Sequence, residues 1–121
     1  MSRATTTLYG IPNCDTVKRA RAWMHEQERA VQFVDFKKTG VPADRLAAWV
    51  QAAGWERVLN RQGTTWRKLD DALRAAVVDA ASATWLMRDH ASVIKRPIVE
   101  WPDGAITVGF DAADWARRVS P

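Results

Sequence analysis

Near the start of the chain, two β-type runs flank a stretch in which apolar residues recur every three or four positions. Residues 5–9 are rich in β-formers and end at a Gly/Pro turn, and residues 31–36 alternate between apolar and polar side chains, so both predict strands. The stretch between them predicts a helix over 15–28. Its expected inner positions are Val17, Ala20, Trp23 or Met24, and Gln27. A β-α-β unit of this length favours a right-handed crossover and a parallel pair of strands.

In the middle of the chain, about 42–90, apolar residues recur only with the three- to four-residue spacing of helices. This stretch follows a polar loop at 37–41, and three helices are predicted within it. Thr64 or Thr65 is placed to cap the second helix, and Asp79 the third. The expected inner positions of the three helices are Leu46, Trp49, Val50 and Ala53, then Trp66, Leu69, Leu73 and Val77, then Ala80, Ala83, Leu86 and Met87.

The last third of the chain predicts two strands and a helix. Residues 94–101 and 105–108 read as strands joined by a tight turn at 102–104, and Asp111 is placed to cap a final helix. The expected inner positions of that helix are Ala112, Trp115, Ala116 and Val119. This element order predicts an α/β, thioredoxin-like fold: a four-stranded mixed sheet flanked by helices. The middle helices form an insertion at about 42–90 within one domain, 1–121.

Composition and charge narrow the classes of function. With 121 residues, 47% hydrophobic and 26% charged, the chain fits one globular domain. No run approaches the ~18 apolar residues of a membrane span, and the first residues lead into a strand, so we expect a cytoplasmic protein. The net charge of +4 comes from 18 basic residues interspersed with 14 acidic ones. This favours a small anionic ligand over nucleic acid.

The candidate for chemistry is Cys14, the only cysteine in the chain, which excludes an intramolecular disulfide. It stands where the first helix should begin, facing the unpaired N–H groups and the positive end of the helix dipole. Both features favour thiolate over thiol. Lys18, four residues on, would lie on the same side of the helix. The alternative interpretation is a small buried hydrophobic residue, the usual fate of a free cysteine.

Two arginines are candidates for holding an anion. Arg96 precedes Pro97, which predicts an extended backbone near the end of the sheet, whereas Arg61 lies in a loop where it is equally well explained as a solvated side chain. Asn13 and Thr16 are placed to hydrogen-bond near the thiol, although turn and capping roles explain them as well. The two histidines, at 25 and 90, have no neighbours at metal-ligand spacing, so we predict no metal site and no tightly bound cofactor.

Four segments together resemble a known family. They are 8–16 (LYGIPNCDT), 63–69 (GTTWRKL), 95–98 (KRPI) and 108–110 (VGF). In this order and spacing the chain is similar to the ArsC/Spx family of thioredoxin-fold proteins, and in particular to its YffB-like branch. The resemblance implies a helical block inserted into the fold. It also implies a cis peptide before Pro97 beside a catalytic cysteine, and X-Pro is the peptide class in which cis bonds occur.

The resemblance also implies three possible functions. Arsenate reductases of the family use a cysteine matching Cys14 and three arginines, of which Arg61 and Arg96 have counterparts here while the third falls at Gly109. Losing one charge-assisted donor costs about 1.5–3 kcal/mol, which argues against arsenate capture. Spx, a regulator that binds RNA polymerase, uses a second cysteine where this chain has Val17.

The YffB-like branch has one cysteine, and it implies a glutathione-dependent monothiol reductase. In that reading Cys14 is the nucleophile, and Arg96, Arg61 and Lys18 assist it. Glutathione is then the co-substrate, and a glutaredoxin or an oxidised protein thiol is a possible partner. Asn13, Thr16 and Pro97 join the two arginines as expected binding residues.

Overall fold

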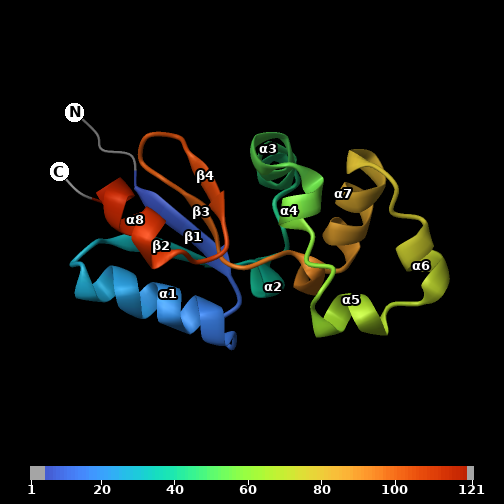
Figure 1. Ribbon diagram of the computed structural model, residues 1–121, viewed down its shortest axis with the longest axis horizontal. Helices are drawn as coiled ribbons and strands as arrows, with labels where there is room; N and C mark the ends of the chain where they lie inside the picture. Colours follow the sequence, from blue (N-terminus) through green and yellow to red (C-terminus); the bar gives the residue numbers. More distant parts are fainter. Residues whose placement is uncertain (1–4, 120–121) are drawn as a thin grey trace. The chain divides into compact units, whose positions relative to one another are not determined.

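The computed structural model describes residues 5–119 and divides into two compact units (Figure 1). The first, the sheet unit, runs to Asp35 and resumes at Arg96. The second, the helical unit, spans Phe36–Lys95. The predicted insertion, about 42–90, falls inside the helical unit.

Four strands and two helices make up the sheet unit. They are β1 (Thr6–Gly10), α1 (Asp15–Glu26), β2 (Val31–Asp35), β3 (Ile98–Glu100), β4 (Ile106–Val108) and α8 (Ala112–Val119). The strand order is β2-β1-β3-β4, with β1 and β2 parallel and β3 antiparallel to both of its neighbours. The predicted four-stranded mixed sheet, its first parallel pair and its final hairpin are confirmed.

The core of the sheet unit lies on the face covered by α1 and α8. Leu8 pairs with Phe33 on one side and Val99 on the other, so these side chains share a face. They meet Val17, Ala20 and Met24 of α1 and Trp115 of α8, all buried. Aromatic rings pack together in this core. The ring centroid of Trp115 lies 4.7 Å from that of Phe110, 5.3 Å from that of Trp101 and 5.8 Å from that of Trp23, each pair edge-to-face. The exposed Ala112 and Ala116 were predicted to face inward, and that prediction is wrong.

Strand β3 is shorter than the predicted run of 94–101. It begins only at Ile98, because Pro97 has no N–H to donate to a ladder. The Arg96–Pro97 peptide is cis. Lys95 instead donates its N–H to the carbonyl of Val58 at 2.8 Å. The cis peptide implied by the family resemblance is confirmed.

The helical unit contains six helices and one 3₁₀ turn among the described residues. They are α2 (Phe36–Thr39), α3 (Ala43–Ala53), α4 (Trp55–Val58), α5 (Thr64–Lys68), α6 (Asp71–Ala75), α7 (Ala80–Asp89) and η1 (Ala91–Val93). A short antiparallel contact closes the unit: Leu59 bridges Ile94, and Asn60 donates its N–H to the carbonyl of Val93 at 2.8 Å. Its buried side chains include Leu46, Trp49, Val58, Ala83, Leu86 and Met87.

Four predictions for the helical unit are wrong. Ala80 was predicted to face inward and is exposed. The polar loop at 37–41 begins with the helix α2. The single helix expected through Leu73 and Val77 is two short helices, α5 and α6, neither of which has a buried residue. The chain breaks between them because Asp70 is the N-cap of a new helix, a role that aspartate favours over a helix interior. The N-cap of α5 is Gly63 and neither Thr64 nor Thr65.

Candidate active site at Cys14

The site begins with a strand, a turn and a helix in direct succession. β1 ends at Gly10, the chain turns through Pro12 and Asn13, and Cys14 is the N-cap of α1 with extended backbone angles (φ −133°, ψ 124°). The carbonyl of Cys14 accepts the first helical hydrogen bond, from the N–H of Lys18 at 2.9 Å. The sulfur therefore lies at the start of a helix of three turns, next to N–H groups that have no partner within the helix.

The surroundings of the Cys14 sulfur lower its pKa. Burial acts in the opposite direction and raises the pKa, but the backbone N–H of Val17, the guanidinium of Arg96 and the backbone N–H of Thr16 together outweigh burial. A thiolate is a much better hydrogen-bond acceptor than a neutral thiol, so nearby donors favour the ionised form. The side chain is half-buried, so a reacting molecule has access to it.

The pairing of β3 with β1 brings Arg96 close to the end of β1, next to Cys14. Ile98 pairs with Tyr9 in the antiparallel contact between β3 and β1, so the residues just before Ile98 lie near the end of β1. The carbonyl of Pro97 accepts a hydrogen bond from the N–H of Gly109 at 2.8 Å. The buried Pro97 and the half-buried Arg96 are thus held against the same edge of the sheet unit as Cys14. The role of Arg96 as an anion ligand stays a prediction.

The other predicted residues of the first turn differ in what they contribute. Thr16 is half-buried, its N–H acts on the sulfur, and its hydroxyl accepts a hydrogen bond from Arg19 Nη2 at 3.5 Å. Asn13 and Lys18 are exposed. The charged group that lowers the pKa of Cys14 is Arg96, and an effect of the Lys18 ammonium on the thiol stays a prediction.

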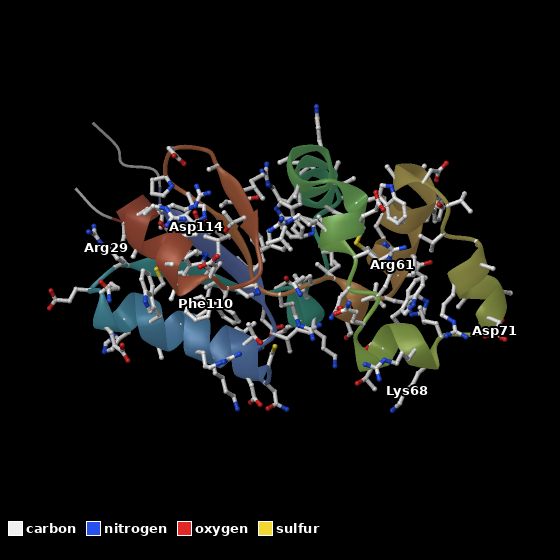
Figure 2. All side chains as sticks on the ribbon, viewed as in Figure 1. Arg29, Arg61, Lys68, Asp71, Phe110 and Asp114 are labelled. Carbon is white, nitrogen blue, oxygen red and sulfur yellow. The ribbon has the colours of Figure 1, made fainter. Side chains whose placement is uncertain are left out.

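Arg61 belongs to the helical unit (Figure 2). Its guanidinium lies 5.4 Å from the ring centroid of Trp55, and its Nη2 lies 3.9 Å from a carboxylate oxygen of Glu56. Both contacts are local and exposed, and they leave the charge of Arg61 only partly compensated. Its role as an anion ligand stays a prediction.

Gly109 stands at the position where the family resemblance implies the third arginine of the arsenate reductases. Its φ is +85°, a backbone conformation that side-chain-bearing residues rarely adopt, and its N–H is bonded to Pro97. An arginine at this position would be strained. Within the sheet unit, the backbone that holds Pro97 in place is therefore built for glycine.

Sequence reasoning did not assign Val17 a functional part. The sequence indicates only that Val17 is a core position, and the family resemblance that Spx has its second cysteine there. In the structure its N–H makes the largest contribution that lowers the pKa of Cys14. The available signal was its place three residues after the N-cap, where helix N–H groups point back at the capping side chain.

Comparison with known proteins places this geometry in a family. The model of the ArsC family matches residues 9–118. The chain belongs to the ArsC family. An uncharacterised protein of Haemophilus influenzae is 32% identical over 109 residues, covering 90% of this chain and 94% of the relative. These findings confirm the resemblance first seen in the four sequence segments.

Solved structures of ArsC-family relatives share the fold. A YffB protein has a TM-score of 0.90 and 44% identity over 96% of this chain and 100% of its own. An arsenate reductase (ArsC) related protein from Brucella melitensis has a TM-score of 0.74 and 41% identity, covering 100% of this chain and 99% of its own. An arsenate reductase from Vibrio cholerae has a TM-score of 0.79 and 18% identity, covering 98% of this chain and 100% of its own. At this identity the similarity supports a shared fold only. The fold of this ArsC-family chain is that of the arsenate reductase-like thiol oxidoreductases.

None of the helices within residues 5–119 has the length and apolar character that a membrane span requires. Nor do three or more histidine, cysteine, aspartate or glutamate side chains gather there in a group that would hold a metal ion.

Proposed function

We propose that this ArsC-family protein is a glutathione-dependent monothiol reductase with Cys14 as its nucleophile. The observation that supports this most is the convergence of Arg96 and the N–H groups of Thr16 and Val17 on the only cysteine of the chain. These groups favour the thiolate, which is the nucleophile in thiol–disulfide exchange. A single cysteine needs an external thiol to complete a redox cycle.

The cycle has two exchange steps. The Cys14 thiolate attacks the glutathione sulfur of a substrate–glutathione mixed disulfide. The S–S bond breaks, the substrate leaves as a thiolate, and a disulfide forms between Cys14 and glutathione. The thiolate of a second glutathione then attacks that disulfide, releasing glutathione disulfide and the Cys14 thiolate. The substrate sulfur is reduced and glutathione is oxidised. The second glutathione gives up its thiol proton to solvent, the departing substrate thiolate takes one up, and Cys14 returns to the thiolate.

The surrounding residues take complementary parts in this proposal. Arg96, beside the sulfur, holds an anionic group of the incoming molecule, such as a glutathione carboxylate, and Arg61 offers a second charged donor. Lys18 adds positive charge along α1 and favours the thiolate. We assign Asn13, Thr16 and Pro97 to contacts with the peptide part of glutathione.

The compartment and the partners follow from the same chemistry. A glutathione pool kept reduced, as in the cytosol, would drive the second step, and we place the protein there. A glutaredoxin would serve in place of the second glutathione, and an oxidised protein thiol in place of a small substrate.

Mass spectrometry after incubation with glutathione disulfide at pH 7 tests the proposal. We expect one glutathione per chain on Cys14, no adduct in Cys14→Ser, and slower formation in Arg96→Ala, because the thiolate and the anion both lose their guanidinium. Lys95→Ala is the matched control, since it removes the neighbouring, exposed charge. Absence of the adduct while iodoacetamide still modifies Cys14 would overturn the proposal.

The same samples distinguish the competing activity. With glutathione and glutaredoxin supplied, we expect no arsenate turnover above the Cys14→Ser background, because Gly109 replaces the third arginine. Turnover above that background would replace the proposed substrate by arsenate and keep Cys14 as the nucleophile.

A further inference from the structure

Exposed apolar side chains gather around α6 and α7, which follow one another in the helical unit (Figure 1). Within residues 5–119 the exposed large hydrophobic side chains are Leu73 of α6, Val78 of the segment between the two helices and Trp85 of α7. Their exposed fractions are 42%, 72% and 67%. Monomeric proteins rarely expose a large contiguous apolar patch, and such a patch usually marks a binding surface.

A pocket of about 250 Å³ opens in this surface. Leu73 and Val77 line it together with Trp85 and Leu86 of α7, and Asp89 adds a carboxyl group to this apolar lining. Arginine and lysine cover apolar surface with their aliphatic stems while their charged ends stay in a polar setting. A long cationic side chain therefore suits the pocket, with its stem over the apolar lining and its charge at Asp89.

Trp85 separates this pocket from a basic side chain. Successive residues of a helix are turned by about 100°, so Arg88 and Asp89 fall on opposite sides of Trp85. The guanidinium of Arg88 lies 5.8 Å from the ring centroid of Trp85, and Arg88 is not among the residues that line the pocket. Both charged side chains are exposed, and neither forms an ion pair with another residue of the described chain. One face of α7 thus carries an aromatic ring between a base and an acid.

We propose that this face of the helical unit joins two copies of the chain in a symmetric dimer. When a half-turn about an axis parallel to α7 relates the copies, Arg88 of each lies opposite Asp89 of the other, and the two Trp85 rings meet between these pairs. Arg88 of one copy is then the cationic side chain that the pocket of the other receives. This inference is independent of the chemistry at Cys14.

Both the charges and the apolar surface favour a second copy over a different protein. A different protein has to supply a base for Asp89 and an acid for Arg88, whereas each copy of this chain brings both in the required arrangement. The exposed large hydrophobic side chains of residues 5–119 all belong to this patch, so the patch itself is the apolar surface that a second copy offers. Tryptophan and arginine are also the usual anchors of interfaces. A patch of this limited size predicts a dimer that dissociates on dilution.

Sedimentation equilibrium of the full chain measures this association. Between about 5 µM and about 500 µM, the average mass of the wild type should rise from that of one chain toward that of two. Trp85→Glu should weaken the association about tenfold or more, because it removes the central ring and brings two carboxylates together. Circular dichroism checks that each variant is folded, and Trp85→Ser replaces Trp85→Glu if that variant is not.

Exchanging the charges tests the arrangement itself. Arg88→Glu and Asp89→Lys should each weaken self-association, because each places like charges opposite one another twice in the dimer. An equal mixture of the two variants should associate again, because Glu then faces Lys and Arg faces Asp across the axis. Lys68→Glu is the matched control: it changes the net charge as much as Arg88→Glu does, at an exposed side chain of α5 outside the patch, and should leave association unchanged.

Each contrary result overturns the proposal. A wild type that stays a single chain at every concentration would leave the patch to another partner. A dimer that Trp85→Glu and Trp85→Ser leave intact would be joined through another surface. If both charge variants lose association and their mixture does not recover it, Arg88 does not pair with Asp89 of the second copy.

Discussion

Three groups from two separate parts of the chain favour a thiolate at Cys14. Thr16 and Val17 supply backbone N–H groups from the first turn of α1, while Arg96 supplies a guanidinium from the segment before β3, eighty residues further along the sequence. None of these groups is positioned in an unfolded chain. Ionisation of the thiol and folding of the sheet unit are therefore linked.

That linkage predicts how stability changes with pH. The pKa of Cys14 is lower in the folded than in the unfolded protein, so the stabilisation is fully present above the unfolded value of about 8.5. It is lost as the pH falls through the folded value. We expect the free energy of unfolding of the wild type, relative to Cys14→Ala, to rise as the pH is raised through the folded pKa of Cys14 and to level off above the unfolded value. Urea titrations at several pH values measure this difference.

The comparison with Cys14→Ala removes the effects of other titrating groups. Asp79 and Asp114 also have lowered pKa values, from Ser82 and from Arg118 respectively, but they titrate in acid and are shared by both proteins. Parallel stability curves for the two proteins would show that the folded thiol titrates as it does in the unfolded chain.

Residue type and spacing identified Cys14 and Arg96 but not what connects them. A cysteine at a helix start and an arginine before a proline are visible in the sequence, and the structure places both at one edge of the sheet unit. The contribution of Val17 comes from its backbone, which carries no sequence signal of its own. The close approach of the Val17 methyl groups to Gly10 depends on the packing distance between strand and helix. Sequence pattern does not contain that distance.

At the scale of elements, α7 has the best-defined beginning. The Asp79 carboxylate accepts the N–H of Ser82 at 2.9 Å, and the Ser82 hydroxyl accepts the N–H of Asp79 at 3.0 Å. This reciprocal pair is a capping box, and it satisfies two N–H groups at once. The cap predicted at Asp79 is confirmed.

Asp79→Ala should cost about 1 kcal/mol of stability, the usual effect of losing such a cap. Asp70→Ala is the matched control, because Asp70 is the N-cap of α6 but makes no side-chain cap hydrogen bond. Urea unfolding of both variants measures the difference. Equal losses would mean that removing a negative charge near a helix start, and not the capping box, accounts for the effect.

Apolar spacing predicted the buried residues of α1 and α7 except at Gln27 and Ala80, which were expected inside and are exposed, and it misled at α6. Leu86 of α7 is only 7% exposed, as expected, whereas Leu73 of α6 is 42% exposed. Both line one apolar pocket, together with Val77 and Trp85. Spacing states which residues share a side of a helix. Burial also needs a partner surface, and a five-residue helix next to Asp70 buries no side chain of its own.

At the scale of the whole molecule, the fold was predictable because strands and helices follow one another in a recognisable order. The parallel first pair, the final hairpin and a helical stretch between them all match the prediction. The number of helices in that stretch was not predictable: α2, α4, α5 and α6 have only four or five residues each. Segments this short show barely one helical period, so apolar spacing cannot separate them from loops.

Removing a buried aromatic ring should lower the free energy of unfolding more than removing an exposed one. Trp115→Ala removes a ring that is 1% exposed and in contact with three other aromatic rings, so we expect a loss of about 3–5 kcal/mol. Trp85→Ala, at 67% exposure, should cost less than about 1 kcal/mol. Urea unfolding followed by circular dichroism compares the two, with Trp115→Phe as a milder variant if Trp115→Ala does not fold. Similar losses would contradict the placement of the core.

The groups that lower the pKa of Cys14 also determine what fraction of the protein carries a mixed disulfide in a redox buffer. Forming a mixed disulfide at Cys14 forfeits their interaction with the thiolate, and breaking it restores that interaction. The better the thiolate is held, the more readily it departs from a disulfide. Because the chain has one cysteine, occupancy depends on the first power of the ratio of disulfide to thiol in solution. The protein should therefore remain mostly reduced until that ratio becomes high.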